Sequence, residues 1–411
     1  MLGTKNLACL MPLTRAVSFG AAAVLAAGSA GAASTRAHDF QSVYVFTDAR
    51  IGQGPFGPLA TDKAGNLYGT TAFGGLIFGG SGNVYKVTPD GTQTVLYDFS
   101  GAKDGQGPLS GLIADSAGNL YGTTYQGGAN GLGTIFKVAP DGTETLLHNF
   151  AGGANDGSTP LYGVLIRHKT GDIIGTASTG GPINYGVVYK LSASGTLQIL
   201  HAFGGGLADG CNPESNVIED KAGNLYGTTS GCGAHGYGTV FKLAPDGTEK
   251  LLYSFQRGTD GATPRSAPIA DKAGNFYGTT QYGGAADAGT VYKLAPDGTE
   301  TVLYAFQGLQ DGWEPIGGVF LAANGNLYGT TFGGGTASGG DGLGVVFMVK
   351  PDGTEKVLHR FIGQTDGCSP LGALIRNTGA GDKGYLYGTT SNGVGRCSGS
   401  PDYGTIFKIQ Q

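Results

Sequence analysis

The phrase Tyr-Gly-Thr-Thr recurs along this chain of 411 residues at nearly constant intervals. A degenerate copy, Ile174-Gly175-Thr176-Ala177, fills the one gap in the series, and the seven copies are 53, 53, 52, 51, 51 and 59 residues apart. The six complete copies begin at Tyr68, Tyr121, Tyr226, Tyr277, Tyr328 and Tyr387. Because a fixed period near 50 residues in a glycine-rich, strand-forming chain is typical of a β-propeller, this repeat predicts the fold.

The second repeat indicates how one period builds one blade. Residues 109–114, 120–124, 134–138 and 143–150 are β-rich runs separated by turn sequences. Four such strands form an antiparallel meander, and their apolar character on both faces fits a blade packed between two neighbours. We therefore predict an all-β fold, a seven-bladed β-propeller made of four-stranded antiparallel blades.

The two ends of the repeat array complement each other. The last repeat stops after its third strand, at residues 404–409, and a strand-like segment, 43–46, precedes the first repeat. Phe46 lies nine residues before Pro55, just as Phe99 lies nine residues before Pro108. We expect this N-terminal strand to complete the last blade and close the ring, which removes exposed sheet edges. The alternative, an open solenoid, would need polar caps that are not visible in the sequence.

The first residues have the pattern of an export signal. Lys5 and Arg15 are followed by an apolar stretch to residue 27, and Ala30-Gly31-Ala32 is a typical cleavage pattern. The apolar stretch is too short to span a bilayer. We predict a signal peptide at 1–32, a short linker at 33–41 and a single propeller domain at 42–411. The mature chain is then expected in the periplasm or outside the cell, without a membrane span and as a monomer.

The chain is acidic. Loss of residues 1–32, which carry two cations and no anions, changes the formal net charge from −5 to −7. This charge disfavours nucleic acid as a partner. No nucleotide-binding loop, zinc signature or nucleophile elbow occurs in the sequence, so we expect no cofactor and no metal centre.

Four cysteines remain after the predicted signal peptide. Cys211 and Cys368 follow Asp-Gly in units four and seven, and Cys232 and Cys397 lie in the loop after Tyr-Gly-Thr-Thr of the same units. Because neighbouring strand ends bring these positions together, we predict the disulfides Cys211–Cys232 and Cys368–Cys397.

Two sets of side chains offer alternatives that involve a bound cation. Unit four has four potential metal ligands, Cys211, Cys232, His235 and Glu214. Unit seven has the two cysteines without the histidine or the glutamate, which favours disulfides. An aspartate also precedes glycine before the first strand of six units: Asp104, Asp156, Asp209, Asp260, Asp311 and Asp366. A ring of these carboxylates could bind cations or sugar hydroxyls, but their repetition favours a role in capping the backbone N–H groups of their own loops.

The loops opposite the tight turns vary between units, so we expect ligand-binding residues on that face. Departures from the repeat are concentrated in units four to six. Glu214 and Asn216 follow the loop proline of unit four, Arg265 follows that of unit five, and unit six has the only tryptophan, Trp313, beside Glu314. Because the innermost strands line the central channel, we expect Glu214, Arg265 and Glu314 to face one another near its mouth.

The loops after Thr-Thr add aromatic and amide side chains to this face. Aromatic rings with carboxylates and amides fit a carbohydrate-binding platform, and the alternative is a solvated rim with an ion pair and packing aromatics. The predicted ligand-binding residues are Glu214, Asn216, Arg265, Trp313, Glu314, Tyr125, Gln281, Tyr282 and Phe332.

The unit Gly-Asn-Leu-Tyr-Gly-Thr-Thr, followed by Gly-Thr-Ile-Phe-Lys-Val-Ala-Pro-Asp-Gly-Thr, resembles the GloVer tandem repeat of exported bacterial "choice-of-anchor" proteins. The resemblance covers residues 43–409. It implies an exported or surface protein and brings no established catalytic motif.

Three functional hypotheses follow. The first is an exported, non-enzymatic binding propeller that recognises a glycan or another extracellular or envelope ligand. The second is a glycoside hydrolase or lyase acting on polysaccharide, with Glu214 and Glu314 or Asp311 as its acid–base pair. The third is a structural protein of the envelope that acts through protein contacts.

Overall fold

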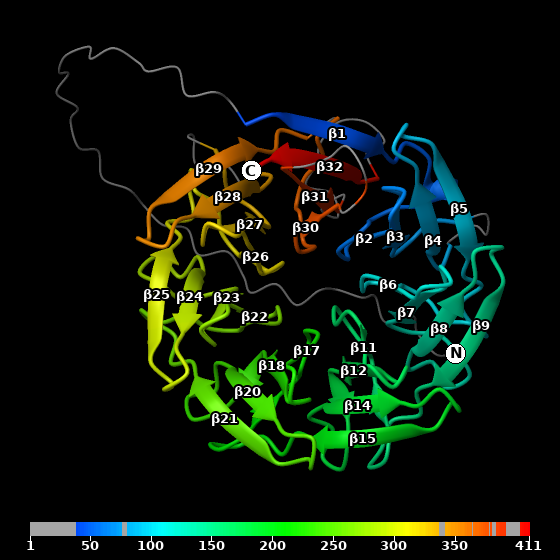
Figure 1. Cartoon of the computed structure of the whole chain (residues 1–411), viewed down its shortest axis with the longest axis horizontal. Helices are drawn as coiled ribbons and strands as arrows, with labels where there is room; N and C mark the ends of the chain where they lie inside the picture. Colours follow the sequence, from blue (N-terminus) through cyan, green and yellow to red (C-terminus); the bar gives the residue numbers. More distant parts are fainter. Residues whose placement is uncertain are drawn as a thin grey trace, which may run out of the picture. The chain divides into compact units, whose positions relative to one another are not determined.

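The computed structural model describes residues 38–75, 80–336, 342–363, 365–377, 379, 384–391 and 403–411. Within them, seven four-stranded antiparallel sheets stand in a ring (Figure 1), which confirms the predicted seven-bladed β-propeller. The predicted signal peptide, 1–32, lies outside the described residues.

Blades 1 to 6 run in chain order from an inner strand near the axis to an outer strand on the rim, whereas the outer strand of blade 7 is β1 (Phe40–Val45). Blades 1 to 4 are built from β2 (Ala60–Thr61), β3 (Leu67–Thr71), β4 (Asn83–Val87), β5 (Gln93–Asp98); β6 (Ile113–Ala114), β7 (Leu120–Thr124), β8 (Thr134–Val138), β9 (Glu144–Asn149); β11 (Ile166–Arg167), β12 (Ile173–Ala177), β14 (Val187–Leu191), β15 (Leu197–Ala202); and β17 (Ile218–Glu219), β18 (Leu225–Thr229), β20 (Thr239–Leu243), β21 (Glu249–Ser254). Blades 5 to 7 are built from β22 (Ile269–Ala270), β23 (Phe276–Thr280), β24 (Thr290–Leu294), β25 (Glu300–Ala305); β26 (Val319–Leu321), β27 (Leu327–Thr331), β28 (Val345–Val349), β29 (Glu355–Arg360); and β30 (Ile375–Arg376), β31 (Tyr385–Thr390), β32 (Thr405–Gln410), β1 (Phe40–Val45). Shorter elements lie in the loops: η1 (Ala49–Ile51), the pair β10 (Gly157–Ser158) and β13 (Thr179–Gly180), and the pair β16 (Gly210–Cys211) and β19 (Gly231–Cys232).

The N-terminal strand closes the ring, as predicted. β1 pairs antiparallel with β32, from Phe40 opposite Ile409 to Val45 opposite Thr405. The strand begins three residues earlier than the predicted start at Val43. Its first residue, Phe40, is outside the predicted strand. The Phe40 ring stacks on His359 of blade 6 with ring centroids 3.6 Å apart, so that the added residues also contact the neighbouring blade.

An edge-to-face aromatic contact of one kind joins every pair of adjacent blades. The phenylalanine that follows the outer strand of one blade meets, edge to face, the third-strand aromatic ring of the next blade, with centroids 4.9 to 5.3 Å apart. Such pairs stabilise a core beyond their buried area. The seven pairs, including the one across the closure, are Phe46–Tyr85, Phe99–Phe136, Phe150–Tyr189, Phe203–Phe241, Phe255–Tyr292, Phe306–Phe347 and Phe361–Phe407.

The Tyr-Gly part of the repeated phrase fixes a turn and makes room for this aromatic layer. In blade 1 the Tyr68 hydroxyl donates a hydrogen bond to Asp62 Oδ2 at 3.0 Å and so holds the turn between the first two strands. Gly69 lies against Tyr85, and a Cβ at this position would collide with that ring. Any residue larger than glycine would therefore displace the third-strand aromatic side chain.

The two threonines of the phrase bond in different directions. Thr71 Oγ1 donates to Asn83 Oδ1 of its own blade at 3.0 Å, whereas Thr70 Oγ1 donates to the Ser110 carbonyl of blade 2 at 2.8 Å. Because that carbonyl serves the preceding blade, most of the predicted first strand, 109–114, does not pair within its own sheet, and β6 has only two residues. The predicted second and third strands coincide with β7 and β8.

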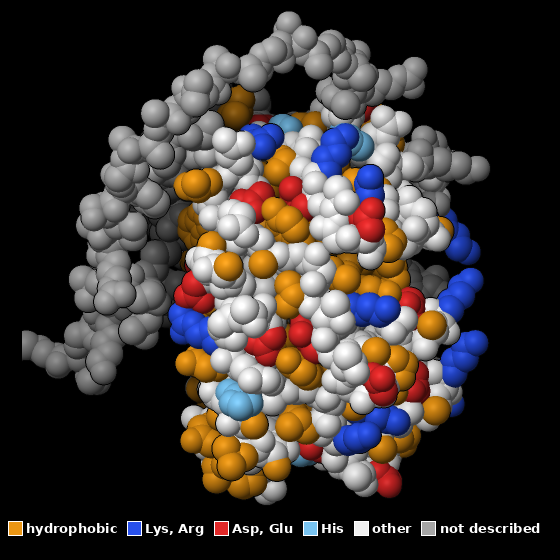
Figure 2. Space-filling model, turned by 90° about the vertical axis from the view of Figure 1, so that its left-hand side faces the viewer, with side chains coloured by type: hydrophobic (Ala, Val, Ile, Leu, Met, Phe, Trp, Pro, Cys, Tyr) orange, Lys and Arg blue, Asp and Glu red, His pale blue; other side chains and the backbone are white. Residues whose placement is uncertain are grey.

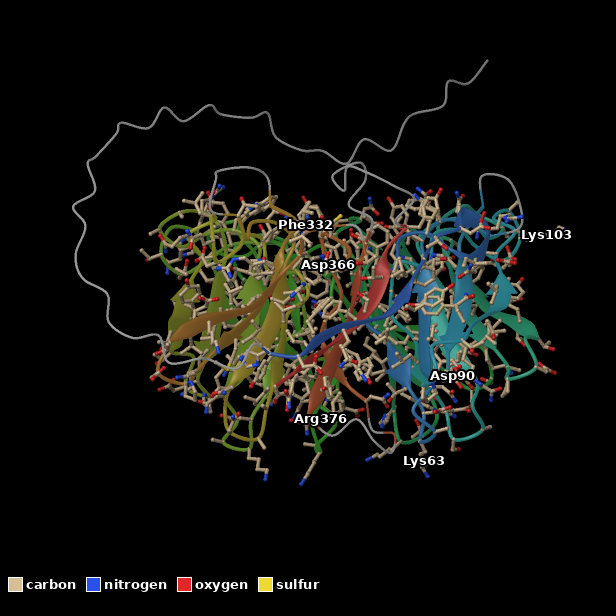
Figure 3. The ribbon with its side chains drawn as sticks, turned by 90° about the horizontal axis from the view of Figure 1, so that it is seen from above. Lys63, Asp90, Lys103, Phe332, Asp366 and Arg376 are labelled. Atoms are coloured by element: carbon tan, nitrogen blue, oxygen red, sulfur yellow. A yellow bond between two sulfur atoms is a disulfide. The ribbon has the colours of Figure 1, made fainter. Side chains whose placement is uncertain are left out.

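The outer wall is chemically mixed. Figure 2 shows the side on which β25 and β29 lie, where positive and negative side chains are interspersed with apolar ones. The two ends of the ring carry different connections, the tight turns at one end and the variable loops at the other. Figure 3 shows the turn face, with Lys63, Asp90 and Arg376, opposite the loop face, with Lys103 and Phe332.

Candidate ligand-binding face

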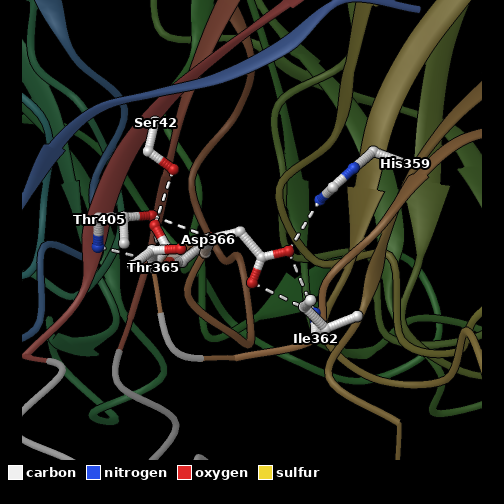
Figure 4. Close-up of polar contacts among 7 residues, drawn as sticks. Ser42, His359, Ile362, Thr365, Asp366 and Thr405 are labelled. Carbon is white, nitrogen blue, oxygen red and sulfur yellow. Dashed lines mark hydrogen bonds and ion pairs between the residues drawn. The ribbon is translucent and has the colours of Figure 1, made fainter. Parts of the chain in front are cut away.

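The Asp-Gly loops on the loop face are held by their own aspartates (Figure 4). Asp366 accepts hydrogen bonds from the backbone N–H of Ile362 at 3.2 Å and shares one with His359 Nε2 at 3.0 Å. All six aspartates accept a backbone N–H from four or five residues earlier in the chain. The capping role is therefore present in every unit that has this aspartate. Among the described residues, no group of three or more His, Cys, Asp or Glu side chains is arranged to hold a metal ion.

The histidines of the outer strands replace tyrosines in these loops. In blade 1 the Tyr97 hydroxyl donates to Asp104 at 2.7 Å, and in blade 2 the Nε2 atom of His148 lies 3.1 Å from Asp156. The ring holds the equivalent loop in both cases. Each of these histidines therefore contacts the aspartate of its own loop, and the histidines lie on separate blades rather than in a cluster.

In four blades the outer strand begins with a glutamate that lies near the aspartate of the Asp-Gly loop entering that blade. Their Oε1 atoms are buried and make no hydrogen bond within the described part of the chain: Glu144, Glu249, Glu300 and Glu355. Burial first, and then the charge of the neighbouring loop aspartate, raises the pKa of three of them from 4.5 to about 7: Glu249, Glu300 and Glu355.

These glutamates should make stability depend on pH. Because their folded-state pKa lies above the unfolded value, their contribution is fully present below pH 4.5 and is lost as the pH rises through about 7. The triple variant E249Q/E300Q/E355Q should therefore melt a few degrees higher than the parent protein at pH 8 and lose most of this gain at pH 4.5. Thermal unfolding followed by circular dichroism at both pH values measures the difference.

Blade 1 has a natural precedent for this change, since Gln93 occupies the equivalent position. The reverse substitution, Gln93→Glu, places a carboxyl where Ile51 replaces the loop aspartate, so its effect at pH 8 should be smaller. An unchanged pH slope in the triple variant would contradict this explanation.

The predicted disulfide in unit four is confirmed. Cys211 and Cys232 are bonded, with Cα atoms 5.3 Å apart, and they join β16 to β19 on the loop face. Both sulfur atoms are therefore used, and the alternative metal site with His235 and Glu214 is wrong. In unit seven, Cys368 is buried and its predicted partner, Cys397, lies outside the described residues, so that pair stays a prediction.

A single backbone device anchors the rim of the loop face in all seven blades. The residue before the loop proline has a positive φ of 50° to 68°, donates its N–H to the preceding blade and accepts a hydrogen bond from its own blade. This conformation is strained for non-glycine residues and persists only where surrounding contacts impose it. Five of the seven positions are not glycine: Thr159, Asn212, Thr263, Glu314 and Ser369. The candidate site residues next to these prolines therefore stand on a rigid rim.

The structure pairs two of the predicted site residues across blades 4 and 5. Arg265 Nη1 lies 3.2 Å from Glu214 Oε2, and both side chains are largely covered. Arg265 and Asn216 also line the axial cavity, which has a volume of about 50 Å³. Such a cavity holds a few water molecules, whereas small-molecule sites typically occupy about 300–1,000 Å³. A sugar would therefore have to bind on the loops above the channel.

A second group joins blades 5 and 6. Gln281 Nε2 donates to Glu314 Oε2 at 3.1 Å and to the Tyr282 hydroxyl at 3.0 Å. Trp313 meets Phe332 edge to face at 5.7 Å, and Gly333 lies directly beneath the indole. Glu314 thus bonds to Gln281, a contact that sequence reasoning did not predict because the two residues belong to loops of different types.

The remaining candidates lie apart from these groups. Tyr125 belongs to the loop after β7 in blade 2, and its backbone N–H donates to Gly107. Asp311 is buried, accepting hydrogen bonds from the Gln307 N–H at 2.7 Å and the Tyr304 hydroxyl at 2.8 Å. Its carboxylate is thus part of the capping system of its loop.

These features define a closed seven-bladed propeller with a disulfide-bonded loop face. The chain belongs to the Gloeobacter/Verrucomicrobia repeat family, whose profile matches residues 28–222 and 213–411. This membership confirms the resemblance carried by the repeated phrases. Family and disulfide are both consistent with an exported protein.

Comparison with known proteins adds only distant likenesses. No curated protein matches the chain. Among solved structures, a candidate 6-phosphogluconolactonase from Bacteroides uniformis is 16% identical with a TM-score of 0.48, covering 74% of this chain and 83% of its own. A candidate glucose dehydrogenase from Thermus thermophilus is 14% identical with a TM-score of 0.44, covering 90% and 99%. A candidate gluconolactonase is 16% identical with a TM-score of 0.39, covering 67% and 80%.

Proposed function

We propose that this protein is an exported, non-enzymatic binding propeller that recognises a glycan on the loop face of blades 4 to 6. The observation that carries the proposal is the position of the residues that break the repeat. They occupy three successive blades on one face and are mounted on the anchored rim. We call this set the recognition surface: Glu214, Arg265, Gln281, Tyr282, Trp313, Glu314 and Phe332.

The chemistry of the recognition surface suits a ligand rich in hydroxyl groups. Trp313 and Phe332 offer apolar ring surface to sugar C–H groups, and Glu314, whose side chain is held by the buried Gln281, supplies a carboxylate next to it. The Arg265–Glu214 pair adds charged donors and acceptors one blade away. Extracellular or periplasmic glycans are ligands of this kind.

Export of the protein is part of this proposal. In the described part of the chain, no helix has the length and apolar character that a membrane span requires. The disulfide between Cys211 and Cys232 suits an oxidising compartment such as the periplasm or the cell exterior. The predicted signal peptide at 1–32 would take the chain there.

A glycan array probed with the mature protein, combined with an assay for released reducing sugar, tests this function. We expect binding without sugar release. Trp313→Ala should weaken binding about tenfold or more, because it removes the largest aromatic surface of the recognition surface. The matched control is Phe73→Ala, which removes an exposed aromatic ring from the loop face of blade 1 and should leave binding unchanged.

Two results would contradict the proposal. Release of reducing sugar that depends on Glu214 or Glu314 would make the protein an enzyme. Equal binding by the Trp313 and Phe73 variants would show that the recognition surface is not the binding site.

A further inference from the structure

The interface between blades 2 and 3 contains a cavity of about 370 Å³ on the turn face. This volume lies within the usual range of small-molecule sites, about 300–1,000 Å³, and is much larger than that of the axial cavity. The cavity lies among the turns opposite the recognition surface. Its main lining residues are Tyr121, Lys137 and Leu147 of blade 2, and Arg167, Leu191 and Ser194 of blade 3.

A local departure from the repeat opens this cavity. In five other units the glycine of the turn between the third and fourth strands packs on a carbonyl of the preceding blade, so that an added Cβ would lie 2.8 to 3.7 Å from that oxygen. At Gly195 of unit three, nothing lies within 4 Å. The five packed glycines are Gly91, Gly142, Gly247, Gly298 and Gly353.

The same turn has also lost its proline. In unit two, Pro140 packs over Gly118 of the adjacent turn, and an added Cβ there would lie 3.3 Å from the proline ring. Ala193 occupies the proline position in unit three, and the corresponding Gly171 has only an Arg167 nitrogen nearby, at 3.9 Å. Loss of the glycine contact leaves the blade 3 turn unpacked against blade 2, and loss of the proline leaves space between the two turns of blade 3.

The cavity has an excess of positive charge. Its two charged lining residues are Lys137 and Arg167. Arg167 lies across the Tyr121 ring, 5.6 Å from its centroid, and its Nη1 is 3.2 Å from Asp115 Oδ2, which balances its charge and fixes its position. Lys137 has no ion pair with any residue that the structure describes. One cation is therefore left to attract an anion.

The rest of the lining is divided between hydroxyl groups and aliphatic side chains. Ser192 and Ser194 lie on the turn with their hydroxyl oxygens 2.8 Å apart, and Leu146, Leu147 and Leu191 supply apolar surface. We propose that this cavity binds a small organic carboxylate with a compact apolar body. The carboxylate would bind Lys137 beside the serine hydroxyls, and the apolar body would pack on the leucines.

Isothermal titration of the mature protein with 3-phenylpropionate tests this site. We expect saturable binding, and binding at least about tenfold weaker for 3-phenylpropionamide, because the amide has the same shape without the charge. Lys137→Met should also weaken binding of the carboxylate about tenfold. The matched control is Lys242→Met, which removes the equivalent lysine beside Tyr226 in blade 4 and should leave binding unchanged.

A second variant tests the cavity independently of its charge. Ala193→Pro restores the residue found in the other tight turns and should fill the space over Gly171, which abolishes binding without loss of thermal stability. The proposal fails if 3-phenylpropionate does not bind at millimolar concentration, or if the amide binds equally well. It also fails if the Lys137 and Lys242 variants bind alike, or if Ala193→Pro binds like the parent protein.

Discussion

Replacement of Phe46 by alanine should destabilise the propeller by about 3–5 kcal/mol, the usual cost of removing a buried phenylalanine from a core. The ring of Phe46 is 0% exposed, and it meets Tyr85 of blade 1 edge to face at 5.1 Å. Its backbone N–H also donates to Gly404 of the last repeat at 2.9 Å. The substitution therefore removes packing at the closure of the ring while it keeps the backbone pairing. Equilibrium unfolding in guanidinium chloride measures the free energy.

Phe203→Ala is the matched comparison, because Phe203 makes the same contact between blades 3 and 4, at 5.2 Å from Phe241. If the closure is as strong as an internal junction, the two variants should lose similar free energy. A loss at Phe46 close to that of the exposed Phe73→Ala would show that the N-terminal strand does not close the ring in solution.

Loss of the disulfide should cost about 3 kcal/mol, the value expected for a closed loop of this size. The bonded cysteines, Cys211 and Cys232, are 21 residues apart in sequence. The double variant C211S/C232S should therefore unfold at a lower denaturant concentration than the oxidised parent. Its N–H groups in β16 and β19 should also exchange faster, because the pairing of these two short strands loses the covalent link beside it.

Peptide mass mapping without reductant provides the check on connectivity. It should recover one linked peptide pair containing Cys211 and Cys232. A link from Cys211 to Cys368, or free thiols at both positions of unit four, would contradict the structure. Equal stability of the double variant and the oxidised parent would mean that the disulfide adds no stability to these loops.

The sequence predicted the fold well because each unit repeats its own local signals. The period, the tight turns and the second and third strands depend on neighbouring residues, and β7 and β8 have the predicted bounds. The inner strand was too long in the prediction because the Ser110 carbonyl bonds to the preceding blade. That contact joins residues 40 positions apart, so no local pattern announces it.

The candidate site was predicted less completely, for the same reason. The proximity of Glu214 and Arg265 follows from their matching positions in adjacent units, and the structure pairs them. The hydrogen bond between Gln281 and Glu314 links two different loop types, and the cavity near Lys137 arises from packing that is missing. A missing contact becomes visible only when the units are compared in three dimensions.

The pairing of β1 with β32 also determines when the molecule can be completed. Phe40 and its partner Ile409 belong to opposite ends of the repeat array. The first strand of the propeller must therefore wait, with its hydrogen-bonding groups unsatisfied by the sheet, until β32 has been made. Blades 1 to 6 can assemble in order as they emerge, but the seventh joins the first and last strands of the propeller. Ring formation is thus a late event that cannot precede synthesis of all seven blades.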